Sequence, residues 1–177
     1  MQKTSFLHRF FGHLSTVLTH KWWVFYYACK VGIPWQGFWH DMSKFSPVEF
    51  FEGVKYYTGT SSPINACKAA NGGLSNAWLH HSGRNKHHWE YWYDITQHKA
   101  NYIPIRFIKE MLCDYIAAGR TYDKHSFSYQ KESEWWQNQL WYRKIDIERH
   151  SASILSGFFD LLETYGEEGF DIIKTIV

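Results

Sequence analysis

Side chains that commonly bind metal ions recur along the chain in a fixed order. The candidates are His20, then His40 and Asp41, then His80, His81, His87 and His88, and then Asp114. Imidazole and carboxylate groups together suit manganese, iron, cobalt or nickel, and also zinc. A site with several such ligands and open positions can activate water against a phosphorus centre. The sequence therefore predicts a metal-dependent hydrolytic site.

The pair His40–Asp41 lies at the centre of this pattern. Two adjacent side chains can reach one ion only where the backbone bends, and Gly37 before the pair and Pro47 after it allow a bend. Lys44 follows about one helical turn later, where its ammonium can hold a phosphate oxygen as a point charge. We expect His40 and Asp41 to bind metal, and Asp41 and Lys44 to act in catalysis. The alternative is a capping aspartate beside an incidental histidine.

Two histidine pairs make residues 80–88 the densest polar stretch of the chain. If this stretch is one helix, His81 and His88 lie on one face, roughly 10 Å apart along its axis, which suits two neighbouring ions. If Gly83 breaks the helix, either member of each pair can turn inward. We predict His81, with His87 or His88, as ligands. The alternative is a surface patch that scavenges metal or responds to pH.

His20 and Asp114 complete the predicted ligand set. His20 falls on an otherwise apolar helical stripe, and its position twenty residues before the next candidate suits two consecutive helices that pack together. Asp114 lies between apolar residues, where a carboxylate is costly unless it meets a cation or a metal. Glu110, one turn earlier, is a supporting or alternative ligand. The alternatives are a core histidine and a salt bridge from Asp114 to Arg106 or Arg120.

Basic and aromatic residues beside the histidines predict how a substrate is held. Arg84 and Asn85 can grip a phosphate or a ribose, and Arg84 can also neutralise charge during catalysis. Trp89 and Trp92 offer faces on which a nucleobase stacks. With Lys44, these four residues form the predicted substrate-binding set. For any single tryptophan, a place in the core is the alternative.

The first thirty residues read as one amphipathic helix. Their apolar side chains recur at near-helical spacing, and Gly32 and Pro34 end the pattern. His20 lies on the apolar stripe and is therefore expected to point inward. Residues 33–37 read as a short linker.

A second helix is predicted from Pro47 to about Tyr57. Ser46 is placed to cap it, Pro47 suits the first helical position, and Glu49 completes a capping box. The other expected elements are a loop over 58–73, a helix from about Ser75, a helical or irregular segment over 86–93, a helix from Ile105 to Ala118 closed by Gly119, a loop over 122–129, and helices over about 130–143, 147–165 and after Gly166. Sustained period-two alternation is missing, so we predict an all-α bundle of about six to eight helices.

Composition narrows the functional classes. The 177 residues contain no internal spacer, which predicts one domain over 1–177. The formal charge of +2 and the lack of a basic stripe argue against duplex nucleic acid but allow a small anionic ligand. Three scattered cysteines indicate neither a disulfide framework nor a thiolate zinc site. No signal peptide or membrane-spanning stretch is evident, so we expect a cytoplasmic protein away from membranes. Assembly into a homo-oligomer stays open.

The ligand order on a helical chain resembles the HD-domain superfamily of metal-dependent phosphohydrolases. The motif His40-Asp41-x-x-Lys44 matches the motif that names this superfamily. A longer signature, with HDMSKF at 40–45, AWLHH at 77–81 and RNKHHWEYW at 84–92, is similar to a small bacterial and phage family within or near it. The likeness covers about residues 13–120, the expected metal-site core, whereas the C-terminal helices over about 130–177 match no family that we can name.

The resemblance implies a helical bundle of five or more helices around one or two metal ions. It implies His20, His40, Asp41 and Asp114 as the shared ligand set, and His81 with His88 or His87 as the set for a second ion. Some two-ion relatives cut cyclic dinucleotides. This chain carries WEYW at 89–92 where that branch has Gly-Tyr-Pro, so that specificity does not transfer.

The leading expectation is therefore a metal-dependent phosphohydrolase. We expect a phosphodiesterase or phosphatase that acts on a nucleotide, including a cyclic signalling nucleotide, with one or two divalent ions. Two rival functions use the same residues. One is a diiron oxygenase of the HD-like type, and the other is a protein that sequesters a nucleotide without turnover.

Overall fold

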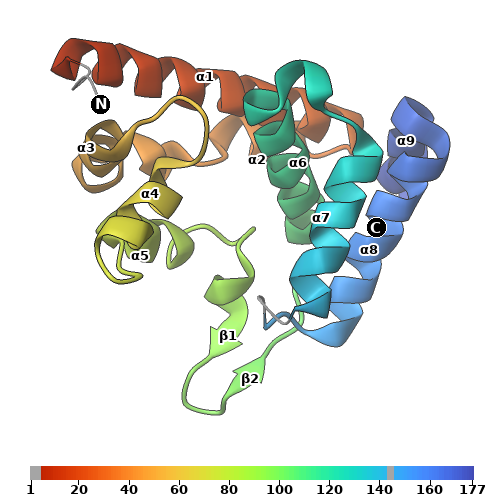
Figure 1. Cartoon of the computed structure of the whole chain (residues 1–177). Helices are drawn as coiled ribbons and strands as arrows, with labels where there is room; N and C mark the ends of the chain where they lie inside the picture. Colours follow the sequence, from red (N-terminus) through yellow and green to blue (C-terminus); the bar gives the residue numbers. More distant parts are fainter. Residues whose placement is uncertain (1–4, 143–145) are drawn as a thin grey trace.

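The computed structural model describes residues 5–142 and 146–177, which fold into an all-α bundle (Figure 1). The predicted fold class is confirmed. The helices are α1 (Phe6–Lys30), α2 (Pro34–Trp39), α3 (Pro47–Tyr56), α4 (Pro63–Ala70), α5 (Asn76–Ser82), α6 (Ile105–Tyr122), α7 (Tyr129–Trp141), α8 (Arg149–Tyr165) and α9 (Gly169–Thr175). Short 3₁₀ turns are η1 (Met42–Phe45), η2 (Trp89–Trp92), η3 (Lys124–Ser126) and η4 (Gly166–Glu168). The strands β1 (Tyr93–Asp94) and β2 (Lys99–Ala100) pair antiparallel.

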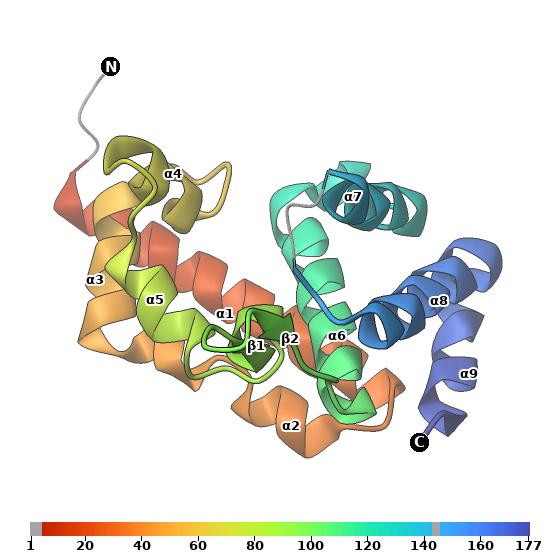
Figure 2. The ribbon, with the colours of Figure 1, turned by 90° about the horizontal axis from the view of Figure 1, so that it is seen from below.

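Helices α1 and α6 form the frame that positions the site. They pack against each other, and α2 folds back against α1. Helices α3, α4 and α5 gather on one side of this frame, and α7, α8 and α9 gather on the other (Figures 1 and 2). No helix among the described residues is long and apolar enough to cross a bilayer.

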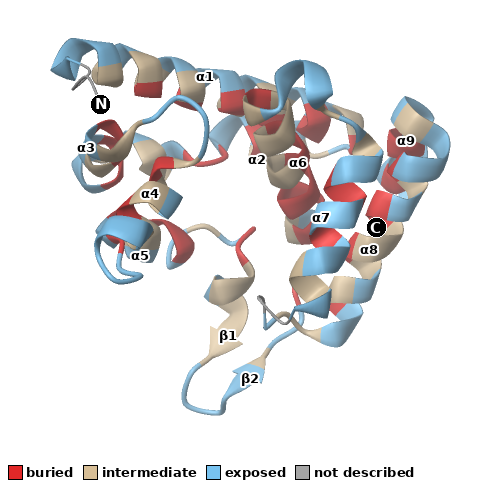
Figure 3. Ribbon diagram, viewed as in Figure 1, coloured by how far each residue is buried: buried red, intermediate tan, exposed pale blue. Residues whose placement is uncertain are grey.

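The apolar core lies where α1, α6, α7, α8 and α9 meet. Fully buried members from these helices include Tyr27, Leu112, Trp136, Phe159 and Phe170. Burial follows one face of each helix, as Figure 3 shows. On α1 the buried face continues past the core to His13 and His20, which confirms that His20 points inward. The same helix therefore supplies both core packing and a polar side chain to the site.

Two short helices occupy stretches expected to be irregular. The linker predicted over 33–37 is wrong, because α2 begins at Pro34 and runs to Trp39. The loop predicted over 58–73 is wrong in its centre, where α4 begins at Pro63. In both helices proline occupies the first helical position, where its fixed φ favours the turn and its missing N–H costs nothing. Each is too short to show a clear apolar period.

The expected end of α6 at Gly119 is also wrong, since the helix continues to Tyr122. Gly119 is needed inside the helix for space. A Cβ at this position would lie 2.0 Å from Oε1 of Glu132 on α7 and 3.0 Å from the Phe127 ring. A glycine that normally signals a helix end here permits a close helix–helix contact.

Helix boundaries elsewhere lie near the expected ones. Ser75 accepts from the backbone N–H of Trp78 and caps α5, and Gly83 ends that helix. Helix α7 begins at Tyr129 and α8 at Arg149, and a tail helix follows Gly166 as expected. The predicted end of the seventh helix at residue 143 lies outside the described residues.

Candidate metal centre

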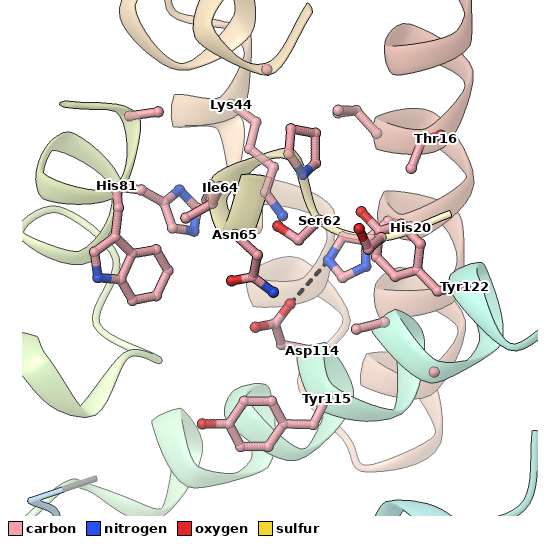
Figure 4. A pocket seen from close by; sticks show the side chains of 18 of the residues that line it. Thr16, His20, Lys44, Ser62, Ile64, Asn65, His81, Asp114, Tyr115 and Tyr122 are labelled. Carbon is pink, nitrogen blue, oxygen red and sulfur yellow. Dashed lines mark ion pairs between the residues drawn. The ribbon is translucent and has the colours of Figure 1, made fainter. Parts of the chain in front are cut away.

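Helices α1 and α6 bring His20 and Asp114 together where they pack. His20 Nε2 lies 2.9 Å from Asp114 Oδ1 (dashed line in Figure 4). Asp114 also lies 3.4 Å from His40 Nε2, so it faces two imidazoles. The alternative salt bridge is not formed, because Arg120 donates to the Tyr27 hydroxyl and Arg106 lies over the Phe107 ring.

The bend expected at His40–Asp41 is present just after α2. Asp41 has a φ of +53°, a left-handed conformation that aspartate tolerates better than most residues. The turn directs its carboxylate into the site, where Oδ2 lies 3.2 Å from His40 Nε2. The other oxygen, Oδ1, lies 3.3 Å from His87 Nε2 and 3.4 Å from His81 Nε2. Each oxygen of the Asp41 carboxylate therefore faces at least one of the candidate histidine ligands.

The two histidine pairs behave differently from each other. Because α5 ends at Gly83, residues 87 and 88 follow an irregular path and both turn inward, with the ring centres of His81 and His88 only 4.8 Å apart. The single-helix alternative, with a 10 Å separation, is wrong. In the first pair His81 points inward, whereas His80 is half-buried and contacts Glu49.

The inward side chains offer atoms that could bind metal in three groups. Two donor groups share Asp41: one consists of His20, His40, Asp41 and Asp114, and the other consists of Asp41, His81, His87 and His88. The third consists of His40, His87 and Glu110. Within each group the atoms lie within 4.8 Å of one another. The structure thus places all seven predicted metal ligands in one cluster.

The strongest sign that these residues fit a metal is a set of buried atoms without hydrogen bonds. Six ligand atoms make no hydrogen bond with any described residue: Nε2 of His20, His40, His87 and His88, and both oxygens of Asp41. All of them except Nε2 of His88 lie in ion-pair range of a neighbouring group. A buried polar atom without a hydrogen bond costs free energy, and a buried charge costs more. One ion in each of the two groups that share Asp41 would satisfy all six atoms. Nitrogen and oxygen donors without thiolate suit manganese, iron, cobalt, nickel or zinc.

Carboxylates behind the imidazole rings fix their orientation. Glu110 lies 2.9 Å from His40 Nδ1 and 3.1 Å from His87 Nδ1, and the Gln36 amide donates to its other oxygen. Glu49 lies 2.8 Å from His81 Nδ1. A proton on each Nδ1 leaves Nε2 free to bind metal and raises its basicity.

Glu49 and Gln36 were missed as parts of the site. The sequence places Glu49 as the acid of a capping box, and Ser46 does accept from its backbone N–H at 3.4 Å. Its carboxylate, however, turns to His80 and His81. Only the pairing of a buried acid with a histidine on a distant helix could reveal this role, and sequence spacing does not contain that information.

Replacing Glu110 with glutamine tests the orienting role. We expect Glu110→Gln to weaken metal affinity about 10–100-fold, because the neutral amide polarises His40 and His87 less than the carboxylate does. Metal affinity can be measured by competition with a chelating dye. The exposed Glu163→Gln on α8 is the matched control and should leave affinity unchanged. Equal affinity in Glu110→Gln and the wild type would refute the role.

The charges of the cluster suit metal binding at every ligand with a shifted pKa except His40. Burial alone would raise the pKa of Asp41, but the charges of His40 and Lys44 hold that pKa well below its usual range. Burial and the Lys44 ammonium lower the pKa of His20 to about 4, and burial lowers the pKa of His88 well below its usual value. Burial alone would also lower the pKa of His40, but the carboxylates around it raise that pKa well above its usual value. Because only the neutral imidazole binds metal, a metal must displace the proton from His40.

A cavity of about 720 Å³ opens onto this cluster. Helices α1, α3, α4, α5, α6 and α7 contribute to its walls. Figure 4 shows Lys44 pointing between His81 and His20, with Ser62, which precedes α4, and Asn65 of α4 close by. The Lys44 ammonium lies 2.5 Å from Asp41 Oδ2, beside the metal ligands. The volume is in the range of small-molecule sites.

The predicted substrate residues divide into two sets. Lys44 and Trp89 line the cavity, as expected. Arg84, Asn85 and Trp92 are not among its lining residues. Arg84 is exposed and donates to the His80 carbonyl, and Trp92 donates to the Lys86 carbonyl. The structure therefore does not bring these three side chains to the same cavity as Lys44.

Asn85 instead supports the cluster from behind. Its amide donates to Ser43 Oγ at 2.9 Å and to the His81 carbonyl at 2.9 Å. Arg84 and Asn85 also border a second depression of about 380 Å³, which His40, Asp41 and His87 of the cluster line as well. Asn85 thus holds His81 and η1 in place.

A carboxyl in the cavity wall predicts a pH-dependent stability. Burial, with the like charge of Asp123, raises the pKa of Glu132 from 4.5 to about 7. Between these values the folded state binds a proton that the unfolded chain releases, so stability falls as pH rises from about 4.5 to about 7. We expect Glu132→Gln to raise the free energy of unfolding at pH 8 by roughly 1–2 kcal/mol, a value reduced for solvent screening.

Urea denaturation at pH 5 and pH 8 measures this effect. The gain in Glu132→Gln should be present at pH 8 and nearly absent at pH 5. Glu163→Gln, exposed on α8, should follow the wild type at both pH values. A Glu132→Gln variant with the same pH dependence as the wild type would contradict the assignment.

Comparisons with known proteins identify a family but no activity. Residues 9–160 match the model of a family described as a family of unknown function, DUF5662. No curated protein and no solved structure matches the chain. The family match runs from α1 into α8 and so includes all residues of the metal cluster and of the cavity wall.

Proposed function

The chain belongs to the DUF5662 family of unknown function, and we propose that it is a metal-dependent phosphohydrolase. The substrate class proposed is a nucleotide, cleaved as a phosphodiester or a phosphomonoester. One observation carries this proposal: six buried ligand atoms that make no hydrogen bond gather beside the Lys44 ammonium at a cavity wall. The ligand order that resembles the HD-domain superfamily supports it.

The donor set favours one or two divalent transition-metal ions. Cys113, the buried cysteine nearest in sequence to Asp114, belongs to neither donor group, so the ligands are imidazoles and carboxylates alone. Such ligands suit manganese, iron, cobalt or nickel, with zinc as a further option. Two overlapping groups that share Asp41 are compatible with two ions. A bound ion of this kind lowers the pKa of water and polarises a phosphoryl oxygen.

The chain's own residues would hold and neutralise the phosphate. Lys44 carries a positive charge next to the ligands, because Asp41 and Asp114 raise the pKa of its ammonium despite burial. That ammonium can bind an equatorial phosphate oxygen and stabilise the charge that builds there. Trp89 in the cavity wall is placed to contact a base.

The direct test is a hydrolysis screen. The untagged protein is loaded separately with each candidate metal and assayed for phosphate or nucleotide release from mononucleotides and cyclic nucleotides under nitrogen. We expect turnover in the wild type and none in the double variant His40→Ala/Asp41→Ala. The exposed His125→Ala, on η3, should match the wild type.

The outcomes separate the proposal from its rivals. Unchanged turnover in the double variant would overturn the proposal. Activity that requires oxygen and iron would favour the oxygenase alternative, whereas activity with manganese under nitrogen would exclude it. Nucleotide that binds tightly and is recovered intact would support a sequestering protein.

A further inference from the structure

Glu132 on α7 is a buried acid in the cavity wall that the proposed chemistry does not use. Its side chain is 8% exposed and lines the same cavity as Lys44. Its carboxylate has neither a hydrogen bond nor an ion pair with any described residue. Lys131, the neighbouring cation, donates instead to the Ser126 carbonyl. A buried carboxylate without a partner is costly, so its presence in a cavity wall calls for a ligand.

Gly119 on α6 provides the space that Glu132 occupies. An alanine Cβ there would lie 2.0 Å from Glu132 Oε1. Glycine inside a helix costs roughly 0.5–1 kcal/mol relative to alanine. Alanine at position 119 would remove the cost of a glycine inside a helix, and glutamine at position 132 would remove the cost of a buried charge. Gly119 and Glu132 are both unfavourable for stability and contact each other in a cavity wall. This combination indicates that Glu132 binds a ligand and does not serve packing alone.

The position of Glu132 separates it from the metal centre. Gly119 follows Asp114 by five residues, which is about 7.5 Å along the axis of α6. Tyr115, next to Asp114, also lines the cavity, and its ring centre is 5.0 Å from that of Trp135 on α7. The cavity therefore offers an aromatic surface as well as the Glu132 carboxylate. A flat ring suits that environment.

The chemistry of a carboxylate narrows the ligand further. Above its pKa of about 7, the Glu132 carboxylate is ionised and has two acceptor oxygens and no donor. Its best neutral partner is a planar group with two adjacent N–H donors, which forms two parallel hydrogen bonds. Asp123 adds negative charge nearby and reinforces the preference for donors.

We infer that Glu132 is a specificity-determining residue that binds a planar ring with two adjacent N–H donors, as in guanine. The two-donor preference rests on the Glu132 and Gly119 contacts. The choice of guanine rests on the proposed function, because guanine is the nucleobase with this edge. The ring lies at the α6–α7 end of the cavity while the phosphate lies at Lys44.

Calorimetric titration with nucleosides at pH 8, where Glu132 is ionised, tests this inference without any turnover. The probes are guanosine and inosine, which differ only by the 2-amino group and carry no phosphate. We expect the wild-type protein to bind guanosine about tenfold or more tightly than inosine, since one hydrogen bond to a charged group is lost. Glu132→Gln should reduce this ratio to less than twofold, because the amide N–H₂ of glutamine is itself a donor and cannot accept a hydrogen bond from the 2-amino group of guanosine.

Gly119→Ala tests the same contact without altering the acid. Its added methyl group displaces the Glu132 carboxylate, so the guanosine preference should also fall to less than twofold. Gly157→Ala on α8, where a Cβ meets nothing within 4 Å, is the matched control and should keep the wild-type ratio. Glu163→Gln is the matched control for charge and should also keep it. Thermal melts establish that each variant is folded.

Two results would overturn the inference. One is a wild-type protein that binds neither nucleoside or binds both equally. The other is a Glu132→Gln variant that retains the preference. These results are distinguishable from a failure of the proposed hydrolysis. A preference for guanosine without turnover would support the role of Glu132 and contradict the hydrolysis. Turnover without a preference would contradict the role of Glu132 and leave the hydrolysis supported.

Discussion

Chelation of the bound metal is expected to lower the melting temperature of the protein by about 8–16 °C. The six ligand atoms of the cluster that lack hydrogen bonds are buried, and their ion-pair contacts with one another, with Asp114 and with Lys44 compensate only part of the cost of burial. Metal present at a thousand times its dissociation constant stabilises the folded state by about 4 kcal/mol. For a chain of this size each kcal/mol shifts the melting temperature by roughly 2–4 °C.

Differential scanning calorimetry with and without a chelator measures the shift. Adding the metal back after the chelator is removed should restore the original melting temperature. Asp41→Ala should melt at the same temperature under all three conditions, because both donor groups lose their shared ligand. A wild-type protein that melts identically with and without chelator would show that no stabilising metal is bound.

Replacing Lys44 with methionine is expected to lower kcat about 10²–10³-fold while the metal content stays the same. Lys44 lies beside the ligands and belongs to neither donor group. Its loss removes a charge that acts on the phosphate in the transition state, so the effect should fall mainly on kcat. Methionine preserves the length of the stem and its packing in the cavity.

Steady-state kinetics and elemental analysis of the same preparation separate the two roles of Lys44. The matched control is Lys55→Met, which removes an exposed ammonium that lies over the Tyr56 ring on α3. It should leave kcat within twofold of the wild type. If Lys44→Met lost its metal together with its activity, Lys44 would be a structural support for Asp41 and not a phosphate-binding residue.

The parts of the site that repeat at helical spacing were predictable from sequence. The stripe that contains His20 continues an apolar face, and burial confirms that orientation. Asp114 stands among apolar residues within one long helix, so its inward direction follows from period alone. The bend at His40–Asp41 was predicted from the flanking glycine and proline, and the positive φ of Asp41 agrees.

The rest depends on contacts between distant segments. Whether His80 or His81 turns inward is decided by where α5 begins and ends, and a shift of one residue would exchange them. Gly119 reads as a helix end unless the Glu132 carboxylate on the next helix is known to occupy its space. Arg84 and Trp92 lie near the histidines in sequence, yet their side chains bind backbone carbonyls outside the cavity. Proximity along the chain does not fix the direction of a side chain in an irregular segment.

The central claim is that the cluster around Asp41 holds metal ions. Elemental analysis of the wild type and of Asp41→Ala, both purified without a metal-binding tag, tests it most directly. We predict near-stoichiometric manganese, iron, cobalt, nickel or zinc, at one or two ions per chain, in the wild type and almost none in Asp41→Ala. Two metal-free proteins that also fail to load in vitro would contradict the claim and the hydrolytic function built on it.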